Sequence, residues 1–423
     1  MVRHQLEVYL DKVFDFAHQV EALPDGRSYA QIPARDVFDA VFFGSACQFN
    51  SLHRIERECK EGALRHRIGA ISEDAIGYVL ERQDPCAIFR LSCQIARQLK
   101  RNGVLASTWS RGLVVAAVDG IEISSSYARC CSLCLEREIE HKVDGELRTD
   151  IQYYHRLCLA TVVSSDFSIP LGIRFQKKGE TEVACSLALL KELVQSLGRR
   201  FVDVLVADAI YLQTPFVEAV EKLGFDWAIN IKANQPDLLA ESERILSAQT
   251  PHPPIQGQSN DLQLWYTPQV NWPVAERDIG VLKTVRTHAR NIQRIKLTAT
   301  GDRQIVRQTV VEQTTNFYAS NLELGAIPPF FIHQLGRSRW QIDVEVFQTI
   351  TNQGALKQPS LHQGYERALM VLTMIRVLAF TLAQVFYHRQ VRSHYRKPTF
   401  GFCDLARRIT EQFLRQNQAP DSS

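Results

Sequence analysis

The chain has no marked excess of charge of either sign. Its 423 residues hold 49 Lys and Arg against 46 Asp and Glu, a formal net charge of +3. Bulk electrostatics therefore does not identify a nucleic-acid-binding protein, and only the distribution of charge along the chain can indicate one. The proportions of hydrophobic residues, 45%, and charged residues, 22%, are ordinary for globular proteins. This length predicts two or three domains.

The sequence also lacks a cleavable secretory segment and a framework of regularly spaced cysteines. Its ten cysteines are scattered through apolar segments, which predicts reduced thiols and a cytoplasmic protein. One apolar run, residues 368–387, is long enough to cross a bilayer, but Arg376 lies in its middle. A buried core helix is the better interpretation, so no membrane partner is expected.

The pattern of apolar residues predicts an α/β fold that follows an N-terminal all-α unit. Residues 1–105 carry apolar positions at helical spacing, with Ser72 as a predicted N-cap and Pro85 as a helix start. A basic cluster within residues 53–67 is interleaved with glutamates, so it fits a DNA-contacting surface and a solvated helix face equally well. From Gly112 on, apolar strand-like runs alternate with helices, which predicts a mixed sheet with flanking helices over 106–248 and 316–390.

A basic, β-rich insertion is predicted for residues 249–315, between those two segments. Its first residues are rich in Pro, Gly, Ser and Asn, and several short strands joined by turns are expected after them. Between Arg277 and Arg307 there are eight Lys or Arg and two acidic residues, which is the clearest basic stripe in the chain. Residues 391–423 are predicted to form a basic, partly disordered tail.

Two aspartates follow strongly apolar strand-like runs and are candidates for a shared metal site. Asp119 ends LVVAAVD and precedes Gly120, which would let the chain turn away, and Asp208 ends FVDVLVAD. Phosphodiester cleavage by two divalent ions needs carboxylates that converge from different elements. A third carboxylate is expected from the helix predicted within Gly336–Lys357, where Asp343 and Glu345 lie near its start.

Taken together, VVAAVDG, VLVADAIY and RSRWQIDVEVF resemble the motifs of DDE transposases of bacterial insertion sequences, in the branch with a β-strand insertion between the second and third acidic residues. The resemblance covers roughly residues 110–390. It implies an RNase H-like core, two Mg²⁺ (or Mn²⁺) ions, and cleavage of transposon-end DNA followed by strand transfer into target DNA. It also implies double-stranded terminal inverted repeats and target DNA as partners, a homodimer in the DNA complex, and nucleoid association in a bacterial cytoplasm.

The resemblance makes Asp119 and Asp208 the first two acidic ligands and leaves the third open. The family's third block has tyrosine, arginine, glutamate and lysine on one helix. Arg339 fits the arginine, but the residue four positions later is Asp343, and Glu345 lies two positions beyond it. Because residues i and i+2 of a helix project to nearly opposite sides, only one of the two carboxylates can face the metals. We favour Glu345, with Asp343 as the alternative.

Basic side chains near these motifs are predicted to bind DNA phosphates. The predicted DNA-binding residues, which include one aromatic side chain, are Lys232, Lys283, Arg286, Arg290, Arg294, Lys296, Arg337, Arg339 and Trp340. Those in the basic insertion are the better candidates, whereas Lys232, Arg337 and Arg339 also fit ordinary surface solvation.

A second metal site is conceivable at Cys131, Cys134, His155 and Cys158, whose side chains are of zinc-binding types. His155 and Cys158 lie an odd number of positions apart on a predicted strand, so they should face opposite sides. Reduced thiols in a hairpin loop are therefore the favoured interpretation.

Three functions fit these patterns. The first is an active DDE transposase. The second is a decayed or repurposed transposase that binds DNA without cutting, which the irregular third acidic block motivates. The third, an RNase H-like nuclease without end specificity, is disfavoured by the large basic insertion.

Overall fold

The computed structural model describes residues 6–143, 145–254, 259, 261–297, 303–322, 327–357, 361–362, 364–391 and 401–417. The chain divides into two compact units. Unit 1 comprises residues 1–202 and 340–423, and unit 2 comprises residues 203–339. This division passes through the predicted catalytic core, and the predicted domain boundaries stay predictions.

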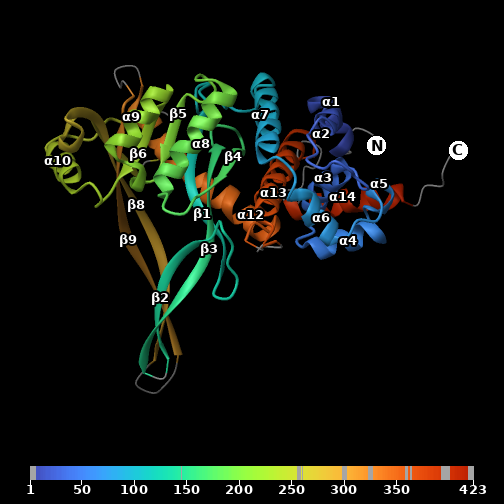
Figure 1. Ribbon diagram of the computed structural model, residues 1–423. Helices are drawn as coiled ribbons and strands as arrows, with labels where there is room; N and C mark the ends of the chain where they lie inside the picture. Colours follow the sequence, from blue (N-terminus) through green and yellow to red (C-terminus); the bar gives the residue numbers. More distant parts are fainter. Residues whose placement is uncertain are drawn as a thin grey trace. The chain divides into compact units, whose positions relative to one another are not determined.

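Unit 1 begins with the helices that the apolar periodicity predicts (Figure 1). Local signals fix two of their starts: the Ser72 side chain accepts a hydrogen bond from the backbone N–H of Ala75, and Pro85 occupies the first turn of its helix. The helices are α1 (Leu6–Phe14), α2 (Phe16–Glu21), α3 (Ala34–Ala46), α4 (Leu52–Lys60), α5 (Arg65–Ile68), α6 (Glu73–Leu80) and α7 (Pro85–Arg101).

The long apolar run forms α13 (Glu366–Phe386), the central helix of unit 1, which continues as a π-helical turn, η5 (Tyr387–Val391). By length and composition Glu366–Val391 passes as a membrane span, but 83% of its apolar window is buried inside the protein. It contacts α3, α6, α7 and β4. The prediction of a buried core helix is therefore confirmed.

Among the residues that the structure describes, the sheet of unit 1 contains the strands β1 (Val115–Ser126), β2 (Leu135–Val143), β3 (Glu146–Val162) and β4 (Ile169–Phe175). β3 pairs antiparallel with each of the other three, and with β2 it extends as a ribbon (Figure 1). Helix α8 (Glu182–Leu197) packs on β3 and β4. The predicted strands near residues 112–175 are present, and β2 is an additional strand.

Unit 2 holds a parallel strand pair and a long antiparallel ribbon. Its strand order is β5-β6-β9-β8-β7, in which only the β5–β6 pair is parallel. The elements are β5 (Val204–Ala207), η2 (Ala209–Tyr211), α9 (Thr214–Leu223), β6 (Asp226–Ile231), α10 (Pro236–Ser247), β7 (Leu262–Trp272), η3 (Pro273–Ala275), β8 (Arg277–Leu297), β9 (Arg303–Ser320) and α11 (Pro329–Ser338).

The prediction of several short strands in the basic insertion is wrong. β8 and β9 are single strands that pair along nearly their whole length, and their far ends form a two-stranded ribbon (Figure 1). At the base of the ribbon, Leu282 and Tyr318 belong to a buried cluster, whereas residues 288–291 and 311–316 are exposed. In this exposed part, the antiparallel pairing of β8 with β9 stabilises the ribbon, because no hydrophobic core covers these residues.

The segment Gly336–Lys357 is helical over much of its length but is not one regular helix. Gly336 lies in α11 of unit 2, where a β-carbon would approach the Tyr318 ring to 2.1 Å. In unit 1 the chain continues through η4 (Ile342–Phe347), a π-helix, into α12 (Gln348–Gln353). π-helical turns are rare and occur frequently at functional sites. Both candidate carboxylates, Asp343 and Glu345, lie in this turn.

The predicted disordered tail contains a helix, α14 (Phe402–Gln416), which contributes four residues to the core of unit 1. Its Phe413 ring meets the Phe43 ring edge-on, with the centroids 5.4 Å apart. Residues 392–400 and 418–423, which complete the predicted tail, lie outside the described residues.

Candidate active site

Asp119 lies within β1 and not at its end, so the expectation that the strand stops there is wrong. β1 continues to Ser126, and Asp119 and Gly120 pair with Leu159 and Cys158 of β3. Gly120 is not a turn residue: it lies within the strand, and a β-carbon there would lie 2.5 Å from the carboxyl carbon of the Glu182 side chain, which would have to move aside. Asp119 is half-buried, and its Oδ1 accepts the Gly120 N–H at 2.8 Å.

Glu345 is held in place by the connection between β3 and β4. Its Oε2 accepts the Ser168 N–H at 3.1 Å and the Ser168 hydroxyl at 2.7 Å. Ser168 is buried, and the neighbouring Phe167 ring stacks on His388 with the centroids 4.2 Å apart. Two hydrogen bonds to one oxygen orient the carboxylate and leave Oε1 without a hydrogen bond from the described residues. Sequence reasoning missed Ser168, because no local motif marks it.

Within unit 1, the structure brings the Glu345 turn onto the strand that carries Asp119, because η4 contacts β1. Asp343 is half-buried in the same turn, and Val344 between the two carboxylates is exposed. Ser168 orients the Glu345 carboxylate. The choice of Glu345 as third metal ligand stays a prediction.

Asp208 follows β5 directly, as predicted, and precedes η2 in unit 2. Its Oδ1 lies 2.9 Å from the Lys232 ammonium. Burial raises the pKa of the Asp208 carboxyl. The ion pair with Lys232, the hydrogen bond from the Ala209 N–H and the charge of Arg339 lower this pKa by more, so the net shift is downward. In the structure the Asp208 carboxylate is therefore paired with the Lys232 ammonium.

The predicted DNA-binding residues fall into three environments. Lys232, Arg337 and Trp340 are exposed, whereas Arg339 is buried. Lys283 and Arg286, at the base of the ribbon, are half-buried. The Lys283 ammonium lies over the Trp265 and Phe317 rings, and Arg286 lies 3.5 Å from Asp261.

The remaining predicted residues, Arg290, Arg294 and Lys296, are exposed along the ribbon. They lie at even positions of β8, opposite Val310, Val306 and Gln304, so all three share one face. Arg307 lies opposite Gln293 and Arg303 opposite Leu297, which places these two on the other face.

No protein-family model matches the chain, and no curated protein sequence matches it. The case for a function therefore depends on the residues and on the geometry described above.

Two groups of His, Cys, Asp or Glu side chains among the described residues place their ligand atoms within 4.8 Å of one another. One is His53, Glu56 and Glu73, whose imidazole and Glu73 carboxylate are exposed. Glu56 is already engaged there, with Lys60 and with the Glu73 N–H. This arrangement is that of an ordinary charged helix surface.

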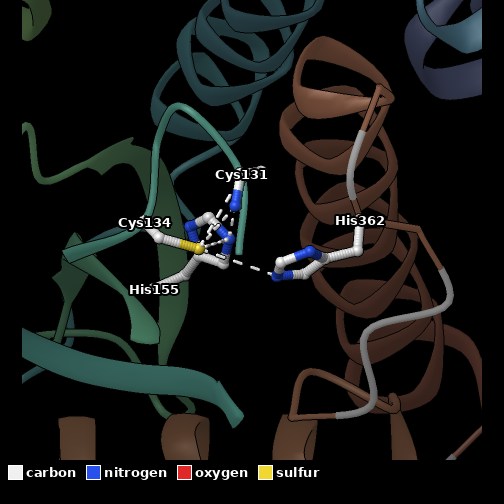
Figure 2. A group of neighbouring side chains, drawn as sticks. All are labelled: Cys131, Cys134, His155 and His362. Atoms are coloured by element: carbon white, nitrogen blue, oxygen red, sulfur yellow. Dashed lines mark hydrogen bonds between the residues drawn. The ribbon is translucent and has the colours of Figure 1, made fainter. Parts of the chain in front are cut away.

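The other group corrects the zinc site that the sequence suggested. It contains Cys131, Cys134 and His155, but its fourth member is His362 and not Cys158 (Figure 2). Cys158 contacts the Glu182 carbonyl and Cys185 instead. This agrees with the expectation that the side chains of His155 and Cys158 point to opposite faces of the strand.

Proposed function

We propose that the chain is a DDE-type transposase with an RNase H-like catalytic core. The observation that supports the proposal is in unit 1: the π-helical turn that carries Glu345, whose carboxylate is held by Ser168, contacts the strand that carries Asp119. Asp208, at the end of a parallel strand in unit 2, supplies the second acidic ligand. Carboxylate oxygens from separate elements, completed by water and substrate phosphate oxygens, are suitable ligands for Mg²⁺ or Mn²⁺.

In this proposal Asp119, Asp208 and Glu345 would hold two divalent ions, which when bound would supply activation of the attacking oxygen and charge stabilisation of the leaving oxygen in an in-line displacement. In the first step a water oxygen attacks the phosphorus at the transposon end, and the 3′-oxygen leaves as a hydroxyl. In the second, that 3′-hydroxyl attacks a phosphodiester of the target DNA and displaces its 3′-oxygen. Ser168 orients one ligand throughout, and Lys232 neutralises Asp208 until the cation binds.

The basic face of the β8–β9 ribbon is the proposed contact with duplex DNA. Arg290, Arg294 and Lys296 are exposed in a row, and a two-stranded ribbon fits the major groove. Lys and Arg contacts to phosphates supply the sequence-independent part of the affinity for DNA. The enzyme is proposed to act on transposon ends and target DNA as a homodimer.

A DNA-binding protein that has lost cutting is the second candidate. The observation that favours it is the third acidic block, where Asp343 stands four residues after Arg339 in place of the expected glutamate. Both candidates retain the basic ribbon, so binding alone does not separate them.

The test is cleavage of a labelled duplex taken from the inverted repeats that flank the gene, incubated with the full chain and Mg²⁺. The proposal predicts a nick at the repeat end that leaves a 3′-hydroxyl. Asp119→Asn and Asp208→Asn should shift the duplex in a gel without cutting it. A wild-type protein that shifts the duplex but leaves it uncut would establish the second candidate, and indiscriminate cutting of unrelated DNA would indicate a general nuclease.

A further inference from the structure

The side chains of Cys131, Cys134, His155 and His362 converge from three segments that are far apart in the sequence (Figure 2). Cys131 and Cys134 lie in the connection between β1 and β2, and the Cys134 N–H donates to the Cys131 carbonyl to close a tight turn. His155 projects from β3, and His362 precedes α13. Cys134 and His155 are buried, and the other two are half-buried.

Four of the six distances between the ligand atoms match those of a tetrahedral zinc site, and all six are within 4.8 Å. A zinc ion with Zn–S bonds of about 2.3 Å and Zn–N bonds of about 2.0 Å separates its two sulfurs by about 3.8 Å and each sulfur from a nitrogen by about 3.5 Å. The two Sγ atoms lie 3.7 Å apart, and His155 Nε2 lies 3.5 Å from each of them. His362 Nε2 lies 3.7 Å from the Cys134 Sγ.

These distances exclude a disulfide between the two cysteines as the arrangement seen here, because bonded sulfurs lie about 2.05 Å apart. The donor types also discriminate among metals. Mg²⁺ and Ca²⁺ take oxygen ligands, whereas two sulfurs and two imidazole nitrogens are a standard set for a structural zinc ion. We propose that Cys131, Cys134, His155 and His362 bind one zinc ion in a closed, four-coordinate site.

The surroundings of the site indicate what the zinc ion does. Ser132, inside the cysteine turn, donates hydrogen bonds to Glu366 in the first turn of α13. The Glu81 carboxylate accepts the Ala368 N–H of the same helix at 2.8 Å. The cysteine turn, the sheet and the start of the core helix therefore meet at this point. With all four positions taken by protein ligands, the ion has a structural role and fastens the segment before α13 to β3.

This inference is independent of the proposed transposase activity, because none of the four ligands belongs to the acidic site. The first measurement is the metal content of the full-length protein, purified without chelator and with any affinity tag removed. One zinc ion per chain is expected. A folded protein that contains no zinc and takes up none when it is supplied would overturn the proposal.

Matched cysteine variants identify the ligands. Cys134→Ser should lose the zinc ion, whereas Cys130→Ser, an exposed neighbour outside the group, should keep it. Cys158→Ser should also keep it, although this cysteine is buried on the same strand as His155. Loss of zinc from either control to the same extent as from Cys134→Ser would contradict the assignment.

Cobalt exchange provides a readout that does not depend on the folding of a variant. Co²⁺ in the wild-type site should give the intense visible absorption of tetrahedral coordination together with sulfur-to-metal charge transfer from two thiolates. His362→Gln should weaken or shift the visible bands and leave the two-thiolate charge transfer in place. The pale spectrum of octahedral Co²⁺ in the wild-type protein, or a His362→Gln spectrum identical to that of the wild type, would refute the proposed ligand set.

Discussion

Asp343 and Glu345, two residues apart, are the two candidates for the third acidic ligand of the proposed site. The Glu345 carboxylate is oriented by two hydrogen bonds from a buried serine, and Asp343 lies in the same π-helical turn. We predict that Glu345→Gln abolishes Mg²⁺-dependent cleavage of transposon-end DNA, because the amide is neutral and binds a divalent ion poorly. Asp343→Asn should retain part of the activity. The measurement is the initial rate of nicking, and the reverse order of the two variants would reassign the ligand to Asp343.

The ion pair between Lys232 and Asp208 has a consequence that titration can measure. Lys232→Met should raise the pKa of Asp208, because the variant removes the cation 2.9 Å from its Oδ1. A carboxyl whose pKa is lowered by folding stabilises the fold above its unfolded pKa, about 3.9, and this contribution disappears as the pH falls through the folded value. The variant's loss of stability should therefore be present at neutral pH and absent in acid.

Carbon-detected NMR of the Asp208 carboxyl measures that pKa directly. Lys222→Met is the matched control, since Lys222 lies in the same unit but its ammonium is 3.9 Å from Glu218. The control should leave the pKa of Asp208 unchanged. An unchanged pKa in Lys232→Met would show that the ion pair does not set the charge of this carboxyl.

Among the elements, helices with local end signals were predictable from the sequence. Helices were expected between the strand-like runs that follow Gly112, and α8 (Glu182–Leu197) and α9 (Thr214–Leu223) are two of them. The Thr181 side chain caps the first, and Gly198 and Gly224 follow the two C-termini. These signals act over a few residues, so the sequence carries them without help from distant partners.

Elements that depend on distant partners were not predictable. The length of β8 and β9 follows from their mutual pairing on an exposed ribbon, where no core imposes an alternating pattern on the sequence. His362 could not be recognised as a neighbour of His155, because only the fold brings the start of α13 to the cysteine turn. The serine that orients Glu345 was missed for the same reason.

The basic face of the ribbon predicts a specific salt dependence. Replacing Arg290, Arg294 and Lys296 with alanine should weaken duplex binding and reduce the slope of log affinity against log salt by about 0.9 for each phosphate that the protein no longer neutralises. Arg303→Ala with Arg307→Ala, on the opposite face, is the control and should change the slope less. Anisotropy titrations over a range of salt concentrations measure this, and equal slopes for both sets would exclude the face as the DNA-binding surface.

Helix α13 contains a buried guanidinium that supports its neighbours. Arg376 is 5% exposed and donates to the carbonyls of Ala355, at 3.0 Å, and Asn50, at 3.5 Å. Burial lowers the pKa of Arg376 to about 10, so it remains protonated at pH 7. Arg376→Met should reduce the free energy of unfolding by about 1–3 kcal/mol, because buried carbonyls lose their donor.

Urea unfolding followed by circular dichroism gives this difference in the free energy of unfolding. Arg389→Met, at an exposed position beyond the end of α13, is the control, and it should change the value by less than about 0.5 kcal/mol. If the Arg376→Met protein is as stable as the wild type, the prediction is wrong, and packing of the methionine side chain compensates for the lost hydrogen bonds of the guanidinium.

At the scale of the whole molecule, the proposed activity requires both units. Asp119 and Glu345 belong to unit 1, and Asp208 belongs to unit 2. The central proposal is that these three carboxylates bind divalent metal ions. A zinc ion at the cysteine turn would stabilise unit 1, which contains all four of its ligands. Removing the zinc ion and disrupting the acidic site are therefore expected to have different effects.

Iron-mediated backbone cleavage tests the central claim most directly. Fe²⁺ replaces Mg²⁺ at an oxygen-ligand site and, with ascorbate and peroxide, generates radicals that cut the chain close to the ion. The account predicts cuts beside Asp119, Asp208 and Glu345 in the same sample, all suppressed together by excess Mg²⁺. Cuts confined to one of the two units, or cuts near Asp208 that persist when Mg²⁺ suppresses the others, would contradict it.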